Sequence, residues 1–198
     1  MTIVYQPIRK LGNSRPVGFE CLARFAAEPR CSPDKWFTEA AEAGLGTALE
    51  LAAIRKGLSA LASLPADIYI AVNISPETIL SGDLPDALKG VPAEQILLEI
   101  TEHAHIEEYE RLLRALQPLR VRGVRLAEND AGAGYSGLQH ILQIHPDFIK
   151  LDMALTRNIN LDPARKALAA ALASWRTKAA ARFPERPFLL QNHVGWVE

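Results

Sequence analysis

The sequence has little of several features that would by themselves assign a protein to a class. It has only two cysteines, Cys21 and Cys31, and no Cys-x-x-Cys or Cys/His pattern, which argues against a disulfide scaffold and a zinc finger. Basic and acidic residues nearly balance at 22 and 23, so we expect no broad binding to DNA or RNA. No apolar run approaches the roughly 20 residues that span a bilayer, and the N-terminus lacks the apolar core of a signal peptide. We therefore expect a cytoplasmic protein with no membrane segment in this chain.

What is present is an alternation of apolar segments typical of strands with segments of helical periodicity. The first two expected strands, 3–11 and 16–24, are joined by the turn residues Gly12-Asn13-Ser14, which predicts an antiparallel hairpin. Further strands are expected at 68–74, 95–101, 121–127, 147–151 and 188–194. Helices are expected at 33–43, 47–63, 76–88, 106–119, 136–143 and 163–181. This repeated alternation is typical of a parallel sheet closed into a barrel.

Polar side chains follow apolar residues near the ends of these predicted strands, and in barrels of this kind the carboxyl ends of the strands carry the site. The residues concerned are Glu20, Asn73, Glu99, Asn129, Asp130 and Lys150. Carboxylate and amide oxygens from several strands are what a hard divalent cation requires. The alternative is that each is a solvated strand end, but the number of such positions favours a metal or phosphate site.

Ordered motifs give the sequence a resemblance to a known family. They are YQPI at 5–8, Glu20-Cys21-Leu22 followed by Arg24, VNIS at 72–75, LEITE at 98–102, GAGYSGL at 132–138 and KLD at 150–152. In this order and spacing, from about residue 4 to 174, the chain resembles EAL domains, the cyclic di-GMP phosphodiesterases and their inactive relatives. Cys21 stands where the family signature has alanine, and we interpret it as a small buried thiol, with a redox role as the alternative.

The resemblance implies a modified TIM-type (β/α) barrel with an antiparallel first strand, here lacking the last strand–helix unit. It implies two Mg²⁺ or Mn²⁺ ions that activate a water for in-line attack on one phosphodiester, yielding pGpG. Residues carried over as metal ligands are Glu20, Asn73, Glu99, Asn129 and Asp130, the last for the second ion. Lys150 would orient the water or stabilise charge, and Glu102 would hold the loop at 132–137. The residues expected to contact the dinucleotide are Gln6, Leu22, Arg24 and Asp147.

Two departures weaken the expected metal site. Asn129 occupies the position of an aspartate that both metals share in the family, and a neutral amide cannot bridge two cations as a carboxylate does. Glu128 should not replace it, because adjacent residues of a strand point to opposite faces. The family's later glutamate has only Gln191 as its nearest counterpart, and the sequence ends before the closing strand and helix.

We therefore expect one EAL-like domain over 1–198, with a well-matched barrel at 1–181 and an atypical tail at 182–198. The favoured function is a cyclic di-GMP binding or regulatory module with impaired hydrolysis. The alternatives are an active Mg²⁺- or Mn²⁺-dependent phosphodiesterase and a module that binds only proteins. We also expect a homodimer, formed through the region of the loop at 132–138 as in the family.

Overall fold

The structure is a computed structural model that describes residues 1–10, 14–28, 30–101, 109–131, 141–151, 156–180 and 190–192. The chain divides into two compact units, Met1–Arg125 and Leu126–Glu198, which we describe one after the other.

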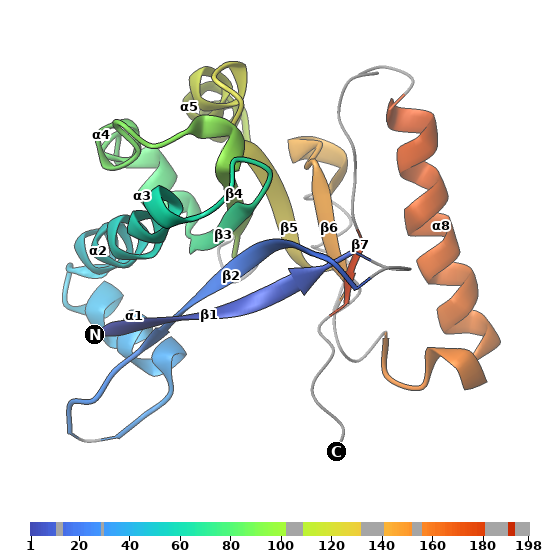
Figure 1. Cartoon of the computed structure of the whole chain (residues 1–198), viewed down its shortest axis with the longest axis horizontal. Coiled ribbons are helices and arrows are strands. Elements are labelled where there is room, and N and C mark those ends of the chain that lie inside the picture. Colours follow the sequence, from blue (N-terminus) through green and yellow to red (C-terminus); the bar gives the residue numbers. More distant parts are fainter. Residues whose placement is uncertain are drawn as a thin grey trace. The chain divides into compact units, whose positions relative to one another are not determined.

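The first unit contains a four-stranded sheet that begins with the predicted hairpin (Figure 1). Strand β1 (Thr2–Arg9) runs antiparallel to β2 (Pro16–Arg24), and β2 is followed in parallel by β3 (Tyr69–Ile74) and then β4 (Ile96–Ile100). These boundaries lie within two residues of the predicted ones. The expectation of one antiparallel pair followed by parallel strands is confirmed.

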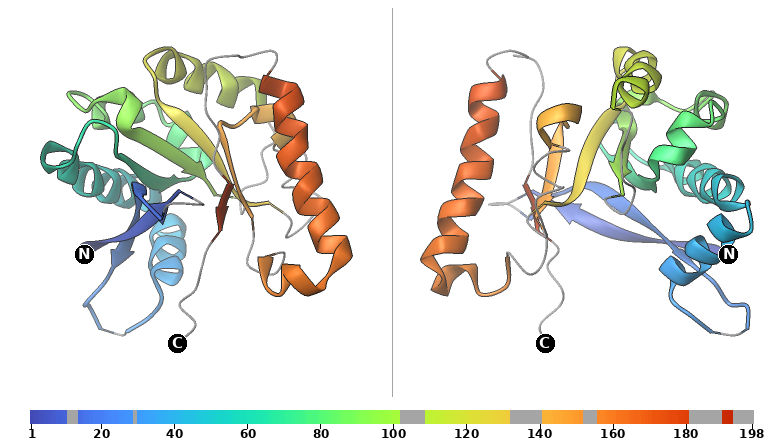
Figure 2. Two further views of the ribbon diagram at one scale, coloured as in Figure 1. Left: turned by 45° about the vertical axis from the view of Figure 1, so that its right-hand side comes forward. Right: turned by 180° about the vertical axis from the view of Figure 1, so that it is seen from behind.

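Helices precede and follow the parallel strands of this unit. They are α1 (Pro33–Glu42), α2 (Gly46–Leu58) with the short 3-10 turn η1 (Ser59–Ser63), α3 (Pro76–Leu80), α4 (Leu84–Ala87), the 3-10 turn η2 (Ala93–Gln95) and α5 (Tyr109–Val121). In Figures 1 and 2, α2, α3, α4 and α5 lie on one side of strands β2–β4. The predicted helix at 76–88 is therefore two short helices, because Gly82 adopts φ +87° between them.

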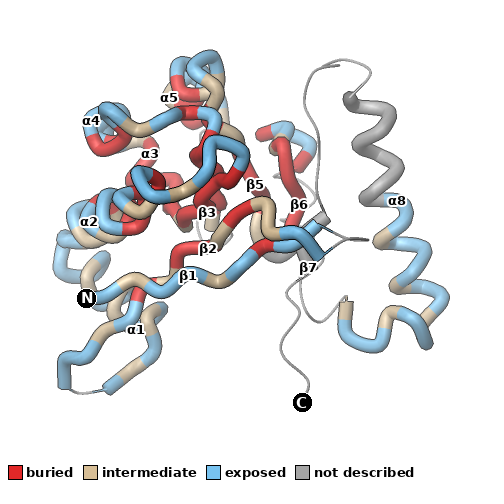
Figure 3. The backbone as a smooth tube through the Cα atoms, viewed as in Figure 1, coloured by how far each residue is buried: buried red, intermediate tan, exposed pale blue. Residues whose placement is uncertain are grey.

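The core of the first unit lies between this helical layer and the strands. Figure 3 shows β3 and β4 as almost wholly buried, whereas β1 is largely exposed. The alternate residues Ile70, Val72 and Ile74 of β3 are at most 2% exposed, as expected for strand residues that face a helix layer. Gly57 of α2 permits a close approach to β2, because an added Cβ would lie 2.7 Å from the Sγ of Cys21.

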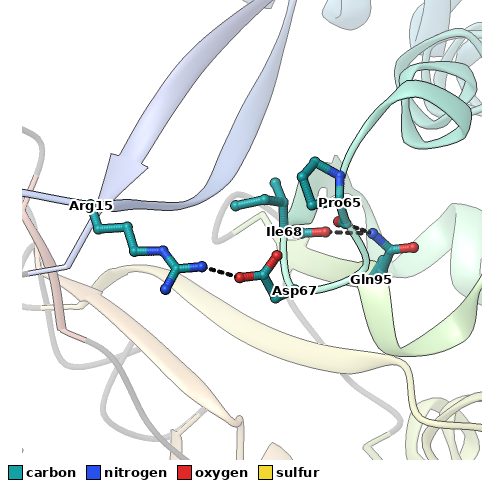
Figure 4. Close-up of polar contacts among 5 residues, drawn as sticks. All are labelled: Arg15, Pro65, Asp67, Ile68 and Gln95. Carbon is teal, nitrogen blue, oxygen red and sulfur yellow. Dashed lines mark hydrogen bonds and ion pairs between the residues drawn. The ribbon is translucent and has the colours of Figure 1, made fainter.

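Hydrogen bonds from the buried Gln95 stabilise the amino-terminal edge of the sheet (Figure 4). The Nε2 of Gln95 donates to the carbonyl of Pro65 at 2.9 Å and to that of Ile68 at 2.7 Å, directly before β3 and β4 begin. Nearby, the exposed Arg15 forms an ion pair with Asp67. In barrels this edge contributes stability, whereas sites lie at the opposite edge.

The end of α5 differs from the prediction. The segment at 121–127 was expected to be a strand, but Val121 is the last residue of α5 and the strand β5 is Arg125–Ala131. Gly123 has φ +112° and its N–H bonds to the carbonyl of Arg120, while Val124 N–H bonds to that of Leu119. This pair of bonds is a Schellman motif, which ends the helix and displaces the strand by four residues.

The second unit pairs β5 with β6 (Phe148–Leu151) and β6 with β7 (Leu190–Asn192), both in parallel. It also contains a helical turn at 141–144, the 3-10 turn η3 (Ile159–Leu161) and the long helix α8 (Pro163–Ala180). Asp162 caps α8, since its Oδ1 accepts from the N–H groups of Ala164 at 2.9 Å and Arg165 at 3.2 Å.

Within the described residues, no helix is both long and apolar enough to cross a membrane. The predicted α/β class, with a mixed sheet whose first strand pair is antiparallel, is confirmed. The division into a single domain over 1–198 stays a prediction.

Candidate functional site

The strand register of the first unit places four of the predicted site residues on one face of the sheet. Gln6 of β1 is opposite Glu20 of β2, which is in register with Ala71 of β3. Two residues further on, Asn73 of β3 is in register with Glu99 of β4. Residues in register on neighbouring strands project to the same side, and residues two apart share a face. Gln6, Glu20, Asn73 and Glu99 therefore belong to one face, opposite to the face of Cys21.

Both carboxylates on this face are withdrawn from solvent. Glu20 is 3% exposed and Glu99 is fully buried, while Asn73 is half-buried. Burial, together with the nearby charges of Glu20 and then Glu99, raises the pKa of the neighbouring Cys21 thiol to about 12. The register of β2, β3 and β4 places these two carboxylates on one face of the sheet. A divalent cation is the group that offsets two buried negative charges most directly.

The raised pKa also bears on the two interpretations of Cys21. At neutral pH a thiol with a pKa of about 12 is protonated, and redox and nucleophilic chemistry require the thiolate. The structure therefore supports the interpretation as a small buried thiol, packed against Gly57 of α2.

The predicted nucleotide-contacting residues of β2 lie at the end of the same strand. Leu22 and Arg24 follow Glu20 at intervals of two, so they continue along its face. Arg24 is exposed, and its Nη1 donates to the carbonyl of Ala23 at 2.8 Å. Beyond it, Phe25 stacks on Trp36 of α1 at 5.4 Å between ring centroids, which ties the end of β2 to that helix. Their contact with a dinucleotide stays a prediction.

The carboxylate of Glu50, which no sequence motif predicted, is bonded to Ser75, two residues beyond Asn73. Oε2 of Glu50, on α2, accepts hydrogen bonds from the backbone N–H and the hydroxyl of Ser75, each at 2.9 Å. Ser75 also caps α3, because its Oγ accepts from Thr78 N–H at 3.2 Å. The Ser75-Pro76 pair is a helix-start signal that could have located this cap, whereas nothing local in the sequence predicts its partner Glu50.

In the second unit, the end of β5 carries Asn129, and Oδ1 of this residue is buried without a hydrogen-bond partner in the described structure. Glu128 is fully buried and in register with Ile149 of β6. A bulge between Glu128 and Ala131 interrupts the regular alternation, which was the basis for expecting Glu128 to face away. The metal roles assigned to Asn129 and Asp130 stay predictions.

Lys150 is 1% exposed on β6 and is in register with Gln191 of β7, the nearest counterpart of the family's later glutamate. Lys150 was expected at the carboxyl end of its strand, and it is the third of the four residues of β6. Asp147 lies at the other end of β6, where its Oδ2 accepts from Leu126 N–H at 2.9 Å and its own N–H bonds to the Leu126 carbonyl at 2.8 Å. These bonds join the starts of β5 and β6. The expected contact of Asp147 with a guanine stays a prediction.

Glu102 and the loop at 132–138 lie outside the described residues, as do the first residues of the predicted helix at 106–119 and most of that at 136–143. Their assigned roles stay predictions.

The donor set of the first unit fits one divalent cation. Within the described residues no group of three or more His, Cys, Asp or Glu side chains is placed to hold a metal. The third oxygen donor on this face is the side-chain amide of Asn73, which is not one of those four residue types. Glu20, Asn73 and Glu99 offer oxygen ligands with two negative charges, which suit a single Mg²⁺ or Mn²⁺ completed by water.

Comparison with known proteins identifies the family. The EAL domain family matches residues 1–179. The chain is 32% identical over 168 residues to an uncharacterized signaling protein of Caulobacter vibrioides, covering 81% of this chain and 21% of that protein. It is 30% identical over 171 residues to the probable cyclic di-GMP phosphodiesterase PdeI of Escherichia coli K12, covering 79% of this chain and 22% of that protein. The chain thus spans about a fifth of the length of these two relatives.

Solved structures agree with this assignment. BlrP1 of Klebsiella pneumoniae, in a complex with calcium and cyclic di-GMP, aligns with a TM-score of 0.76 and 29% identity over 90% of this chain and 46% of that one. An EAL domain protein of Listeria monocytogenes EGD-e shares the fold at a TM-score of 0.76 and 20% identity, over 97% of this chain and 85% of that one. The predicted fold is confirmed to the extent of an incomplete TIM-like half-barrel that matches EAL structures. The chain belongs to the EAL domain family, the family of cyclic di-GMP phosphodiesterases.

Proposed function

We propose that this chain is a cyclic di-GMP binding and regulatory module in which hydrolysis is impaired. The observation that carries the proposal is the amide at position 129, where the family resemblance places a carboxylate shared by two metal ions. Asn129 can offer one neutral oxygen, and its Oδ1 is buried without a hydrogen-bond partner among the described residues. A neutral amide in that position binds a second cation far more weakly than a bridging carboxylate.

Binding is supported by residues that do not depend on position 129. Glu20, Asn73 and Glu99 supply oxygen donors for one cation, and Arg24 is an exposed cation at the end of β2. Arginine recognises phosphate through parallel hydrogen bonds. A bound cation would polarise a phosphoryl oxygen, Arg24 would bind phosphate and Lys150 would stabilise negative charge. BlrP1 was solved with cyclic di-GMP together with calcium or manganese, which supports the same ligands here.

The second candidate is a working Mg²⁺- or Mn²⁺-dependent phosphodiesterase that yields pGpG. It is favoured by the retention of Glu20, Asn73, Glu99 and Lys150. The two candidates differ in whether one firmly bound cation is sufficient for turnover, since the two-metal mechanism uses both ions to generate and direct hydroxide.

Calorimetric titration of cyclic di-GMP into the purified chain, with Mn²⁺ and then with EDTA, tests the proposal when pGpG is assayed in the same samples. We expect binding without product. Asn129→Asp should introduce Mn²⁺-dependent turnover, whereas the same chemical change at the exposed Asn160 should not. Steady product from the unchanged chain would establish the second candidate. Absence of both binding and product would leave a module that recognises proteins.

The proposal includes a homodimer, expected from the family's use of the loop at 132–138. Sedimentation equilibrium with and without cyclic di-GMP tests this expectation, and a monomer under both conditions would exclude it.

A further inference from the structure

The end of β3 is held by a peptide group that is hydrogen-bonded at both ends. The carbonyl of Ile74 accepts from Thr101 N–H at 3.1 Å, and the N–H of the same peptide group, that of Ser75, donates to Glu50 Oε2 at 2.9 Å. This peptide lies one residue beyond Asn73, and Thr101 lies two residues after Glu99. One peptide group therefore connects the strand ends that carry two predicted metal ligands.

The Glu50 side chain belongs to a small polar network behind this peptide. Ser75 Oγ–H donates to Glu50 Oε2 at 2.9 Å, and Ser75 Oγ accepts from Thr78 N–H at 3.2 Å. Thr78 is fully buried and its hydroxyl lies 3.5 Å from that of Thr47, one helical turn before Glu50. An ionised carboxylate that accepts two hydrogen bonds holds its partners more firmly than a neutral acceptor. The network fixes α2, the end of β3 and the start of α3 to one another.

We propose that Glu50 is a positioning residue for the metal site. Its carboxylate fixes the peptide between Ile74 and Ser75, and with it the directions in which Asn73 and Glu99 project. The inference rests on the proposed function, because it assumes that Asn73 and Glu99 bind a cation. Groups that orient metal ligands are needed for full affinity, and their removal typically lowers metal affinity about 10- to 100-fold.

The test uses Mn²⁺ alone as the probe, with free Mn²⁺ measured by electron paramagnetic resonance in titrations of the full chain. Glu50→Ala should raise the Mn²⁺ dissociation constant at least about tenfold. Glu50→Gln keeps an acceptor oxygen at the same reach and should restore most of the affinity. Glu77→Ala is the matched control, since Glu77 is an exposed carboxylate in the first turn of α3 and its loss changes the charge equally.

Two further measurements on the metal-free chain distinguish a positioning role of Glu50 from a merely structural one. Hydrogen exchange at Thr101 N–H should accelerate in Glu50→Ala while exchange within β3 stays slow, and the side-chain amide resonance of Asn73 should shift. Equal Mn²⁺ affinity in Glu50→Ala and the unchanged chain would overturn the inference and leave the proposed function standing. Equal losses in Glu50→Ala and Glu77→Ala would overturn it in favour of a general charge effect. No Mn²⁺ binding by the unchanged chain would refute the proposed metal site, and the inference with it.

Discussion

Gly57 and Cys21 form a packing pair whose energetics can be worked out from the structure. A Cβ added to Gly57 would lie 2.7 Å from Cys21 Sγ, 3.3 Å from Cys21 Cβ and 3.7 Å from Val72 Cγ1. Heavy atoms in contact normally lie about 3.5–4.0 Å apart, so the first distance is well inside contact. Cys21 is 8% exposed and Gly57 is also buried, which leaves neither residue free to move into solvent. The glycine thus accommodates the thiol that replaces the family's alanine.

We expect Gly57→Ala to destabilise the first unit although alanine is the better helix former. Replacing a helical glycine by alanine gains about 1 kcal/mol, whereas overpacking a core typically costs about 1–3 kcal/mol. We therefore expect a net loss of about 1 kcal/mol. Cys21→Ala removes one buried heavy atom and should cost about 1 kcal/mol. In the double variant the new methyl group occupies the space of the lost sulfur, so stability should return to the original value or exceed it. The coupling between the two substitutions is then about 2 kcal/mol, within the range found for residues in contact.

Native-state hydrogen exchange at the Ile70 and Val72 amides measures these changes where they occur. Local exchange is preferred to a global unfolding curve, because the chain divides into two compact units and such a curve would combine their transitions. The exposed Ala52 on α2 gives a matched reference, since Ala52→Gly should cost about 1 kcal/mol through helix propensity alone. If Gly57→Ala increased protection in the presence of Cys21, the packing argument would be wrong.

Further predictions concern reactivity, stability and metal binding. At pH 8 iodoacetamide should modify the half-buried Cys31 while Cys21 stays unreacted until the chain unfolds, and mass spectrometry after timed quenching checks the labelling. Folding raises the pKa of Cys21 from 9.0 to about 12, so the contribution of this thiol to stability is present below about pH 9 and is lost as the pH rises toward 12. Gln95→Met should lower protection of the β3 amides by about 2–3 kcal/mol, since it leaves two carbonyls without their donor, whereas Asp67→Ala should change it by less than about 1 kcal/mol because that ion pair is exposed. Asn129→Asp should tighten the second of two Mn²⁺ binding steps at least about tenfold, and a single unchanged step in calorimetry would contradict the role given to position 129.

The strands were predictable because their signals are local. The turn residues at 12–14 and the apolar runs on either side predicted the hairpin, and the boundaries of β2 agree with the prediction. The positions of Asn73, Glu99 and Lys150 near the carboxyl ends of buried strands were also predictable, whereas their roles in a site stay predictions. Register then showed what the sequence could not, namely that Asn73 and Glu99 are directly paired.

The sequence-based predictions failed where contacts between distant residues decide the structure, or where a local signal was overlooked. Val121 reads as the start of a strand, but Gly123 in a left-handed conformation closes a Schellman motif and extends the helix to Val121. Glu50 could not be found because its partner Ser75 is 25 residues away on another element. The bulge after Glu128 likewise depends on the pairing of β5 with β6 and not on its own sequence. Contacts between elements therefore decided what local patterns left open.

Binding and hydrolysis place different demands on charge, which is why one can persist without the other. Glu20 and Glu99 contribute two negative charges, enough to offset one divalent cation, and a cyclic dinucleotide brings two phosphate charges of its own. Generating hydroxide between two metal ions requires a further carboxylate to hold the second cation in the absence of substrate, and residue 129 supplies an amide. Restoring that single charge should therefore change turnover much more than it changes nucleotide affinity. An Asn129→Asp variant that gained affinity and turnover in equal proportion would show instead that the second metal ion contributes mainly to binding.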